Sequence, residues 1–470
     1  MSEPSSTSVR HMTDLEALMW NLEKDPRLSS TVANLSILDR PVDVDRFRAT
    51  LERASVVFPR LRQRVSPVFG RLAPPTWELD PNFDINFHLK RVSLRTGSRS
   101  ELHELVTSLF MTPFDRTRPL WEFAVIDGLR GGKSAMVQRL HHTITDGEGG
   151  LRLSLEFIDF SRDAPQREPI EIENAPRAES SLASTLVSSL GDAAVHLTRR
   201  QIGVARRTVT STAQSIVRPT EIPRSIASAV ELGMQTANQL NVGDHPMSPL
   251  WVDRSLSRTF DCFDVNLATA KAAATRLGGT LNDFFVAGAA AGAGAYHERM
   301  GNPVAELRMA MPISHRSDKA IGGNVFSPSQ SLMPTGPMSP RDRFTEVHSR
   351  LQRTKRAGAV DAVGAFAGII NLLPTSVVAR TGYRFAGTID FVTSNLRAAP
   401  MDTFIAGALM EANYPLGPLA ATAFNLTTMS YRGSFNMGVV IDTAAIEDPA
   451  MLISSLKAGY RDLLKAGSKS

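Results

Sequence analysis

The chain is 470 residues long, with 42% hydrophobic and 21% charged residues, so it is an ordinary globular sequence that exceeds what one hydrophobic core usually holds. Its formal net charge of +5 is small for this length, and no basic run is interleaved with aromatic residues, which argues against a nucleic-acid partner. The single cysteine, Cys262, excludes an intrachain disulfide and fits a reducing compartment. Because the first residues are polar and carry no apolar signal core, and the longest apolar stretches are shorter than a membrane span, we expect a cytoplasmic protein.

The first half of the chain alternates helical and strand patterns. Asp43 is a candidate N-cap for an amphipathic helix at 43–58, and 100–110 repeats the helical spacing of apolar residues. Two apolar segments, 120–129 and 134–142, flank a Gly-Gly turn and predict a β-hairpin. A further helix is predicted after the hairpin, at 151–160.

A change of composition follows. Residues 162–176 hold three prolines and predict a linker. Residues 181–218 lack proline and carry five arginines with few acids, which predicts a long helix. Two interpretations stay open for it, a domain-bridging helix with a solvated basic face or a helix on a membrane surface; the scarcity of large apolar residues favours the first.

The second half again mixes both types of element. Helices are predicted at 266–278, 280–300, 341–356 and near 448–464, and the second of them is rich in small residues that allow close packing. Strands are predicted at 306–316 and 388–396. A hairpin that turns at Arg432–Gly433 is predicted at 423–442. We therefore expect two layered α/β domains, 1–175 and 246–470, joined by a helical linker at 176–245, with a cleft between them.

The predicted hairpin ends in "HHTITDG", residues 141–147, for which three interpretations compete. The pair of histidines could simply be satisfied by hydrogen bonds at a strand end. It could bind a metal through His142 and Asp146, but a third ligand is required, the other histidines show no ligand spacing and the thiol is isolated, so we expect no metal. Alternatively, a neutral imidazole could act as a general base, with Asp146 as a structural anchor paired to a buried arginine and Gly147 in a tight turn.

Further motifs give this segment a context. "PFDRTRPLWEF" (113–123) followed by "HHTITDG" resembles the bacterial wax ester synthase/acyl-CoA:diacylglycerol acyltransferases, within the CoA-dependent acyltransferase superfamily of chloramphenicol acetyltransferase and peptide-synthetase condensation domains. The resemblance continues in order through "TLNDFFVA" (280–287), "MPISHR" (311–316), "GGN" (322–324) and the segment 414–438, and covers residues 12–465. It implies an α/β (α+β) fold of two chloramphenicol-acetyltransferase-like domains, each a mixed sheet covered by helices, with a crossover and an interdomain tunnel.

The resemblance also implies an activity. We expect transfer of a fatty acyl group from acyl-CoA to a lipid alcohol, which forms triacylglycerol from diacylglycerol or a wax ester from a fatty alcohol. His142 would be the general base within the motif of His141, Asp146 and Gly147, and no cofactor beyond the substrate acyl-CoA is expected. Candidate donors to the oxyanion, or substrate-positioning residues, are Asn282, Ser394 and Asn395.

The other motif residues also have structural interpretations. Packing or turn roles are expected for Pro119, Leu120, Trp121 and Asn324, an ion pair for Arg316, a local salt bridge between Asp115 and Arg118, and helix capping or cross-linking for Asn282 and Asp283. One segment departs from the family pattern, because "SNLRAAP" stands where the family usually has Ser-Asn-x-Pro-Gly-Pro, so this loop is expected to follow another path.

Two alternative functions remain. One is acyl transfer to a different acceptor, such as a polyketide-derived alcohol or an amine, from a carrier-protein donor. The other is a non-catalytic paralogue that keeps the fold and binds lipid. A membrane or lipid-droplet surface stays open as a further partner beside acyl-CoA and the alcohol, with the protein then peripheral to the membrane.

Overall fold

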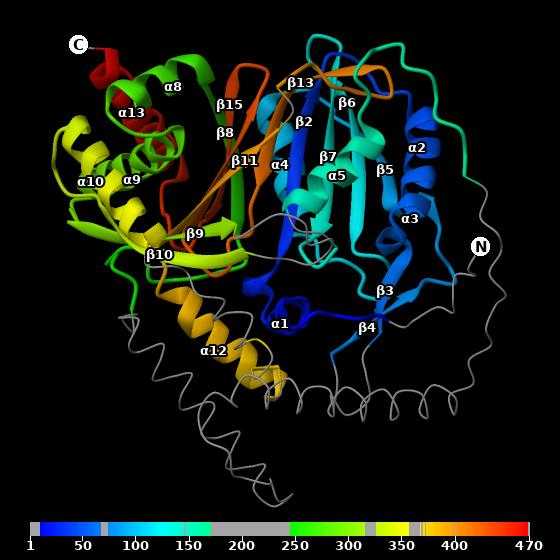
Figure 1. Cartoon of the computed structure of the whole chain (residues 1–470), viewed down its shortest axis with the longest axis horizontal. Coiled ribbons are helices and arrows are strands. Elements are labelled where there is room, and N and C mark those ends of the chain that lie inside the picture. Colours follow the sequence, from blue (N-terminus) through cyan, green and yellow to red (C-terminus); the bar gives the residue numbers. More distant parts are fainter. Residues whose placement is uncertain are drawn as a thin grey trace, which may run out of the picture.

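The computed structural model describes residues 10–66, 74–144, 147–170, 245–314, 326–356, 367, 370–371, 373–398 and 400–468. Two six-stranded sheets stand side by side, each with helices packed on it (Figure 1). The long helix predicted at 181–218, and the motif residues Asp146, Arg316 and Asn324, lie outside the described residues.

The first sheet carries the predicted hairpin at its centre. Its strand order is β12-β13-β2-β7-β6-β5. These strands are β2 (Thr31–Leu38), β5 (Leu89–Ser93), β6 (Trp121–Leu129), β7 (Lys133–His141), β12 (Phe404–Ile405) and β13 (Ala408–Leu416). All neighbours are antiparallel except β5 and β6. The hairpin prediction is thus confirmed, with β7 ending at the first histidine of the pair.

The second sheet has the order β10-β9-β11-β14-β15-β8. Its strands are β8 (Arg258–Asn266), β9 (Glu306–Ser314), β10 (Phe326–Pro334), β11 (Phe391–Arg397), β14 (Phe424–Tyr431) and β15 (Ser434–Asp442). β11 runs parallel to both of its neighbours, so the sheet is mixed. The predicted turn at Arg432–Gly433 is confirmed, since both residues have positive φ angles, 43° and 74°, as a two-residue hairpin turn requires.

A crossover joins the two halves. β12 and β13 follow β11 in the chain, but they pair at the edge of the first sheet, where Met410 lies opposite Leu38 and Leu416 opposite Ala33 (Figure 1, orange β13 beside blue β2). β13 also contacts the second sheet, because the Tyr414 hydroxyl donates to Asp264 at 2.8 Å. The crossover that the resemblance implied is therefore present.

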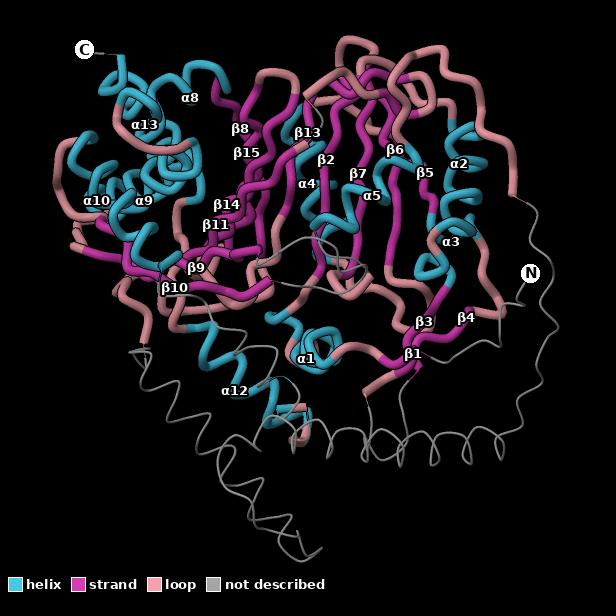
Figure 2. The backbone as a smooth tube through the Cα atoms, in the orientation of Figure 1, coloured by secondary structure: helices cyan, strands magenta, loops and turns pink. Residues whose placement is uncertain are grey.

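Helices pack around both sheets (Figure 2). Around the first sheet lie α1 (Asp14–Leu22), α2 (Val44–Val57), α3 (Ile85–His88), α4 (Arg99–Met111) and α5 (Gly147–Phe157). Around the second lie α8 (Leu267–Arg276), α9 (Leu281–Arg299), α10 (Pro340–Arg356) and α13 (Pro449–Ser468), while α12 (Thr375–Gly387) packs against α1 of the first half. A small three-stranded sheet is formed by β1 (Arg10–His11), β3 (Gln63–Ser66) and β4 (Thr76–Leu79).

The helix boundaries follow from capping side chains. Asp43 accepts a hydrogen bond from Arg46 at the start of α2, and Thr280 forms a capping box with Asp283 at the start of α9. Within the described part of the chain, no helix is both long enough and apolar enough to cross a bilayer.

Three clusters of buried apolar residues form the core. Among the described residues, one cluster lies within the second half, one lies mainly in the first half, and a third is shared: it takes Leu35 from β2, Val106 from α4, Leu416 from β13, and Phe260 and Val440 from the second sheet. Helix α4 thus packs between the two sheets, and the halves meet through apolar contacts as well as through the crossover strand.

Candidate active site

The histidine pair sits at the end of β7, between two neighbouring strands. His141 lies opposite Thr31 of β2 and donates its backbone N–H to the Leu120 carbonyl at 3.0 Å. His142 donates its backbone N–H to the Ser30 carbonyl, also at 3.0 Å. The backbone of the pair is therefore held by the chain segments on either side of β7.

Immediately after the pair the chain turns, and the His141 ring takes part in this turn. The Ile144 N–H donates to the His141 carbonyl at 2.9 Å, and the Thr143 N–H donates to Nδ1 of the His141 ring at 3.2 Å. The Thr143 hydroxyl lies 2.6 Å from the same nitrogen. Because Nδ1 accepts a backbone hydrogen bond, the neutral ring carries its proton on Nε2.

The other ring nitrogen of His141 faces a carboxylate. Nε2 lies 3.1 Å from Oε1 of Glu23, although the two are not aligned as a hydrogen bond, so the attraction is chiefly electrostatic. Burial of Glu23 opposes its ionisation, but His141, the Ser30 N–H and Arg116 outweigh that effect and lower the pKa of Glu23 to about 2. Glu23 is therefore a carboxylate throughout the neutral range.

The two histidines thus have different surroundings. His141 is 1% exposed and both of its ring nitrogens face fixed partners, whereas His142 is half-buried on the first residue of the turn. Because both nitrogens of the His141 ring face fixed partners, this ring is a built-in part of the turn. Gly147 is the first residue of α5, just beyond the turn.

The start of β6 lies beside the strand end that carries the pair, since Trp121 pairs with Leu140 of β7. Leu120 and Trp121 are buried, the Trp121 indole donates to the Leu61 carbonyl at 2.7 Å, and its ring stacks on His88 with centroids 4.3 Å apart. The Pro119 carbonyl accepts the Trp121 N–H at 3.0 Å. These residues hold the start of β6, whose Leu120 carbonyl in turn holds His141.

The local salt bridge expected in this motif is replaced by another. Arg118 lies 3.5 Å from Asp80, while Asp115 accepts hydrogen bonds from the Thr117 N–H and hydroxyl. The Asp115 carboxylate thus binds the backbone two residues later, as in an Asx-turn. This local contact competes with a salt bridge from Asp115 to Arg118.

Two of the candidate oxyanion donors bind one another. The Asn395 amide on β11 donates to the Asn282 amide oxygen on α9 at 3.2 Å, and the Asn282 Nδ2 lies 3.8 Å from the Met311 sulfur. Ser394 is adjacent in β11, so strand alternation turns its side chain to the opposite face of the sheet. The structure therefore brings Asn282 and Asn395 together and separates Ser394 from them.

Asp283 is buried inside the second domain. It completes the capping box of α9, and its Oδ2 lies 2.8 Å from Nδ1 of His348 on α10. This carboxylate fixes the start of α9 and its contact with α10.

The segment that departs from the family pattern continues a regular strand. β11 pairs in register with β14 as far as Arg397, opposite Ser430, and the Ala398 N–H then donates to the Ser430 carbonyl at 3.3 Å. Glycine at position 398 would weaken this extended conformation. Arg397 and Ala398 suit the extended path that this chain takes.

A cleft of about 680 Å³ opens between α4 and β8, where the two halves meet. Its lining includes Thr112 and Arg258. The Thr112 carbonyl accepts a hydrogen bond from buried Arg139, which lies two residues before His141 on β7 and pairs with Glu122 at 2.8 Å. The cleft is therefore linked to β7 through the contact of Thr112 with Arg139, while its lining residues belong to α4, to Thr112 just after it, and to β8.

The thiol that looked isolated in the sequence has partners at the rim of this cleft. Cys262 Sγ lies 3.5 Å from Nε2 of His103 and 3.4 Å from Arg99, while Nδ1 of His103 lies 3.5 Å from Asp261. Histidine, aspartate and cysteine are all metal ligands. Here, however, the two nitrogens of the His103 ring face different partners, and the Arg99 guanidinium lies beside both Asp261 and Cys262. The cluster is a polar contact between α4 and β8. Burial raises the pKa of the Cys262 thiol to about 12.

Three contacts of the site were not predicted from the sequence: Glu23 with His141, Arg116 with Glu23, and His103 with Cys262. Arg116 stood inside a motif, but Glu23 follows an ordinary helix, and nothing in its local sequence marks it. Only the pairing of β2 with β7 brings the loop after α1 to the histidines.

Comparison with known proteins adds family information to this geometry. The sequence model of the wax ester synthase/diacylglycerol acyltransferase catalytic domain matches residues 12–285, and that of the C-terminal domain matches residues 322–463. A Mycobacterium tuberculosis protein named as a diacylglycerol O-acyltransferase is 30% identical over 96% of this chain and 91% of its own length. A second protein of that organism with the same assignment is 28% identical over 97% of this chain and 98% of its own.

Two solved structures share the fold. The wax ester synthase/diacylglycerol acyltransferase from Marinobacter aquaeolei VT8 superposes with a TM-score of 0.67 at 19% identity, covering 98% of this chain and 100% of that one. The first condensation domain of the calcium-dependent antibiotic synthetase superposes with a TM-score of 0.59 at 14% identity, covering 99% and 97%. The two-domain fold is thus shared with both groups of enzymes.

Proposed function

Because the chain belongs to the wax ester synthase/diacylglycerol acyltransferase family, and is an acyltransferase, we propose that His142 removes the proton from an acceptor alcohol while that alcohol attacks the thioester of acyl-CoA. The alcohol oxygen forms a bond to the acyl carbon, the carbon–sulfur bond breaks, and CoA thiolate leaves and takes the proton from His142. The products are an ester and free CoA, and no cofactor is consumed.

The observation that carries this proposal is the division of roles within the pair. The Nδ1 atom of His141 accepts the Thr143 N–H and its Nε2 faces Glu23, which makes it a fixed part of the turn. His142 follows on a backbone held by Ser30. We therefore assign proton exchange with a bound alcohol to His142, the half-buried second histidine of the motif.

Direct transfer is favoured over an acyl-enzyme on cysteine. A thiol whose pKa is raised to about 12 is protonated at neutral pH, and only a thiolate attacks a thioester efficiently. Cys262 is also buried at the contact with α4.

For the oxyanion that forms during attack, Ser394 is our preferred donor. The Asn395 amide is committed to Asn282, and this contact cross-links β11 to the start of α9. Ser394 lies on the face of β11 away from that contact. Its hydroxyl can rotate to donate, as an oxyanion requires.

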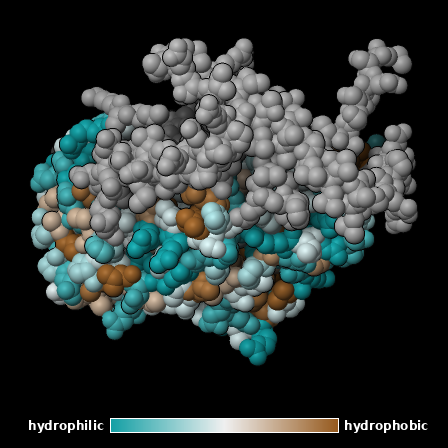
Figure 3. All heavy atoms as spheres, turned by 90° about the horizontal axis from the view of Figure 1, so that it is seen from below, coloured by the Kyte–Doolittle hydropathy of each residue, from teal (hydrophilic) through white to brown (hydrophobic). Residues whose placement is uncertain are grey.

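The acceptor in this proposal is a lipid alcohol, either diacylglycerol or a fatty alcohol, and the protein meets it at a membrane or lipid-droplet surface from the cytoplasmic side. The coloured residues of the face in Figure 3 show apolar side chains scattered among hydrophilic ones, which fits transient contact rather than deep insertion. Flotation with anionic vesicles tests the surface contact, and protein that stays at the bottom at low salt contradicts it.

The central experiment measures release of free CoA from palmitoyl-CoA with diolein or hexadecanol. We expect His142→Ala to lower kcat by roughly 10²–10⁴, the usual contribution of a general base. His11→Gln, on the small sheet away from β7, serves as a matched control and should keep its activity. If the wild type, His142→Ala and the protein-free reaction all release CoA at the same rate, the result would support a lipid-binding paralogue instead.

A further inference from the structure

We propose that Glu23 is the positioning residue of the active site: it holds the ring of His141 and the Ser30 peptide at once, and thereby sets the direction in which His142 points. This inference rests on the proposed role of His142. It assigns a function to a carboxylate that lies outside every motif of the sequence.

The Glu23 carboxylate joins three separate segments of the chain. Oε1 accepts the Ser30 N–H at 2.6 Å and the Ser29 hydroxyl at 3.1 Å, and lies 3.1 Å from Nε2 of His141. Oε2 lies 3.3 Å from the Arg116 guanidinium. With a side chain only 14% exposed, the group is enclosed by these partners and is not a solvated surface charge.

Two routes lead from this carboxylate to His142. Through Ser30, whose N–H binds Glu23 and whose carbonyl accepts the His142 N–H, it fixes the backbone of the base. Through His141, it keeps the proton on Nε2, so that Nδ1 remains free to accept the Thr143 N–H and close the turn. Without the negative charge, the other tautomer would place a proton against the Thr143 N–H and open this turn.

Arg116 fixes the carboxylate from the far side. Its guanidinium donates to the Trp20 carbonyl at 3.0 Å and lies over the Trp20 ring, 3.7 Å from the centroid. Because Trp20 belongs to α1 and Arg116 to the "PFDRTRPLWEF" segment, that motif reaches the histidines through Glu23 as well as through Leu120.

Kinetics of Glu23→Gln test the role of the charge. Glutamine keeps an oxygen that can accept from Ser29 and Ser30 but removes the charge beside His141. Misplacement or wrong tautomers of catalytic histidines cost factors well above ten, so we expect kcat to fall at least tenfold, with KM for palmitoyl-CoA and for the alcohol within twofold.

Asp39→Asn is the matched control. Asp39 lies just beyond the opposite end of β2, pairs with Arg162 at 2.6 Å and accepts the Leu409 N–H at 2.8 Å, so it has similar contacts but none to the histidines. The kcat of Asp39→Asn should stay within twofold of the wild-type value, even if its melting temperature falls by as much as that of Glu23→Gln. Equal losses of activity in the two variants, in proportion to their folded fractions, would overturn the proposal.

Nitrogen spectra of histidine rings supply a second measurement that needs no turnover. The protein is labelled with ¹⁵N-histidine, and His141→Gln assigns the signal. The His141 ring should show the Nε2–H tautomer at neutral pH in the wild type and should no longer be held in this tautomer in Glu23→Gln. A spectrum unchanged by Glu23→Gln overturns the positioning role. If instead the wild type releases no CoA, the proposed function fails while these spectra still decide the role of Glu23.

Discussion

Two adjacent residues of the same type have different surroundings in this protein. His141 ends a buried strand and is held by Thr143 on one side and Glu23 on the other. His142 begins the turn and stays half-buried. In the proposed mechanism, the environment of the two rings, and not the residue type, decides which of them acts as the base.

The ionisation of Glu23 leads to a prediction about stability and pH. Its pKa is about 2 in the folded protein against an ordinary 4.5, so its contribution is complete above about pH 5 and is lost as the pH falls towards 2. Glutamine cannot ionise. The difference in unfolding free energy between the wild type and Glu23→Gln should therefore shrink by up to about 3 kcal/mol between pH 6 and pH 2.5. Urea unfolding at several pH values measures it, and a constant difference contradicts the prediction.

The buried thiol gives another prediction at this scale. Because Cys262 is protonated and enclosed, Cys262→Ala should release CoA at a rate within twofold of the wild type. Native protein should also react slowly with iodoacetamide and quickly once unfolded. A loss of turnover in Cys262→Ala without loss of folded protein would instead indicate a covalent intermediate.

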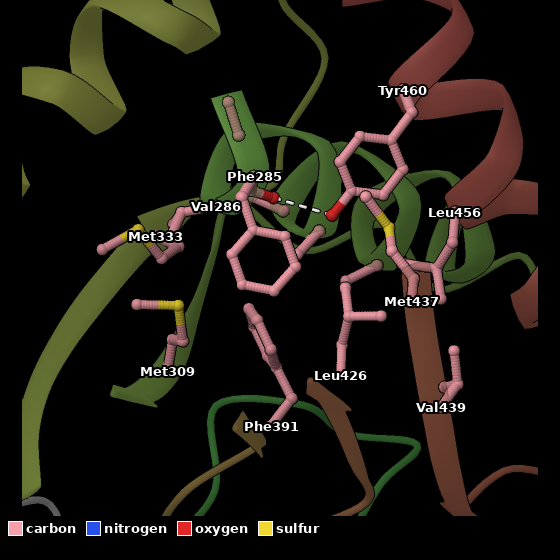
Figure 4. Packing of buried hydrophobic residues seen from close by; sticks show 14 of the residues in the cluster. Phe285, Val286, Met309, Met333, Phe391, Leu426, Met437, Val439, Leu456 and Tyr460 are labelled. Carbon is pink, nitrogen blue, oxygen red and sulfur yellow. Dashed lines mark hydrogen bonds between the residues drawn. The ribbon is translucent and has the colours of Figure 1, made fainter. Parts of the chain in front are cut away.

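At the scale of elements, α9 shows how small residues allow helices to approach. Gly288 lies against the Tyr460 ring and Gly292 against the backbone of Leu456, both on α13, and the Tyr460 hydroxyl donates to the Phe285 carbonyl at 2.8 Å (Figure 4). The close packing expected of this alanine- and glycine-rich helix is confirmed.

Substitution within that contact should be costly. A Cβ at Gly292 would lie 2.5 Å from the Leu456 Cα, so Gly292→Ala forces the helices apart and should lower the free energy of unfolding by about 1–3 kcal/mol or more. Gly387→Ala is the control, since a Cβ at this last residue of α12 meets no atom within 4 Å. Chemical denaturation compares the two; equal stabilities would show that α9 and α13 adjust freely.

The sequence predicts those elements whose signals are local. Asp43 marks the start of α2, the apolar alternation of 120–142 marks the hairpin, and Arg432–Gly433 marks its counterpart in the second half. The crossover of β13 onto β2 follows only from family resemblance, because strand partners distant in sequence leave no local pattern. The same reason hides Glu23, whose contact with His141 depends on how strands pair.

At the scale of the whole molecule, the two halves are joined by a core that belongs to both. Val106 from α4 and Val440 from β15 are buried in one cluster, and Leu416 of the crossover strand lies within it, 1% exposed. A shared apolar core fixes the spacing of the two halves better than a hinge does, as an active site proposed to lie between them requires.

Shared packing predicts that one truncation weakens both halves. Leu416→Ala removes buried methyl groups from the common cluster and should cost about 2–5 kcal/mol. Amide exchange should then quicken in β7 of the first sheet and in β14 of the second by similar factors. The same truncation at Leu452 on α13, in the cluster confined to the second half, should affect β14 at least as strongly as β7. If Leu416→Ala quickens exchange in only one sheet, the halves unfold independently and the crossover strand does not couple them.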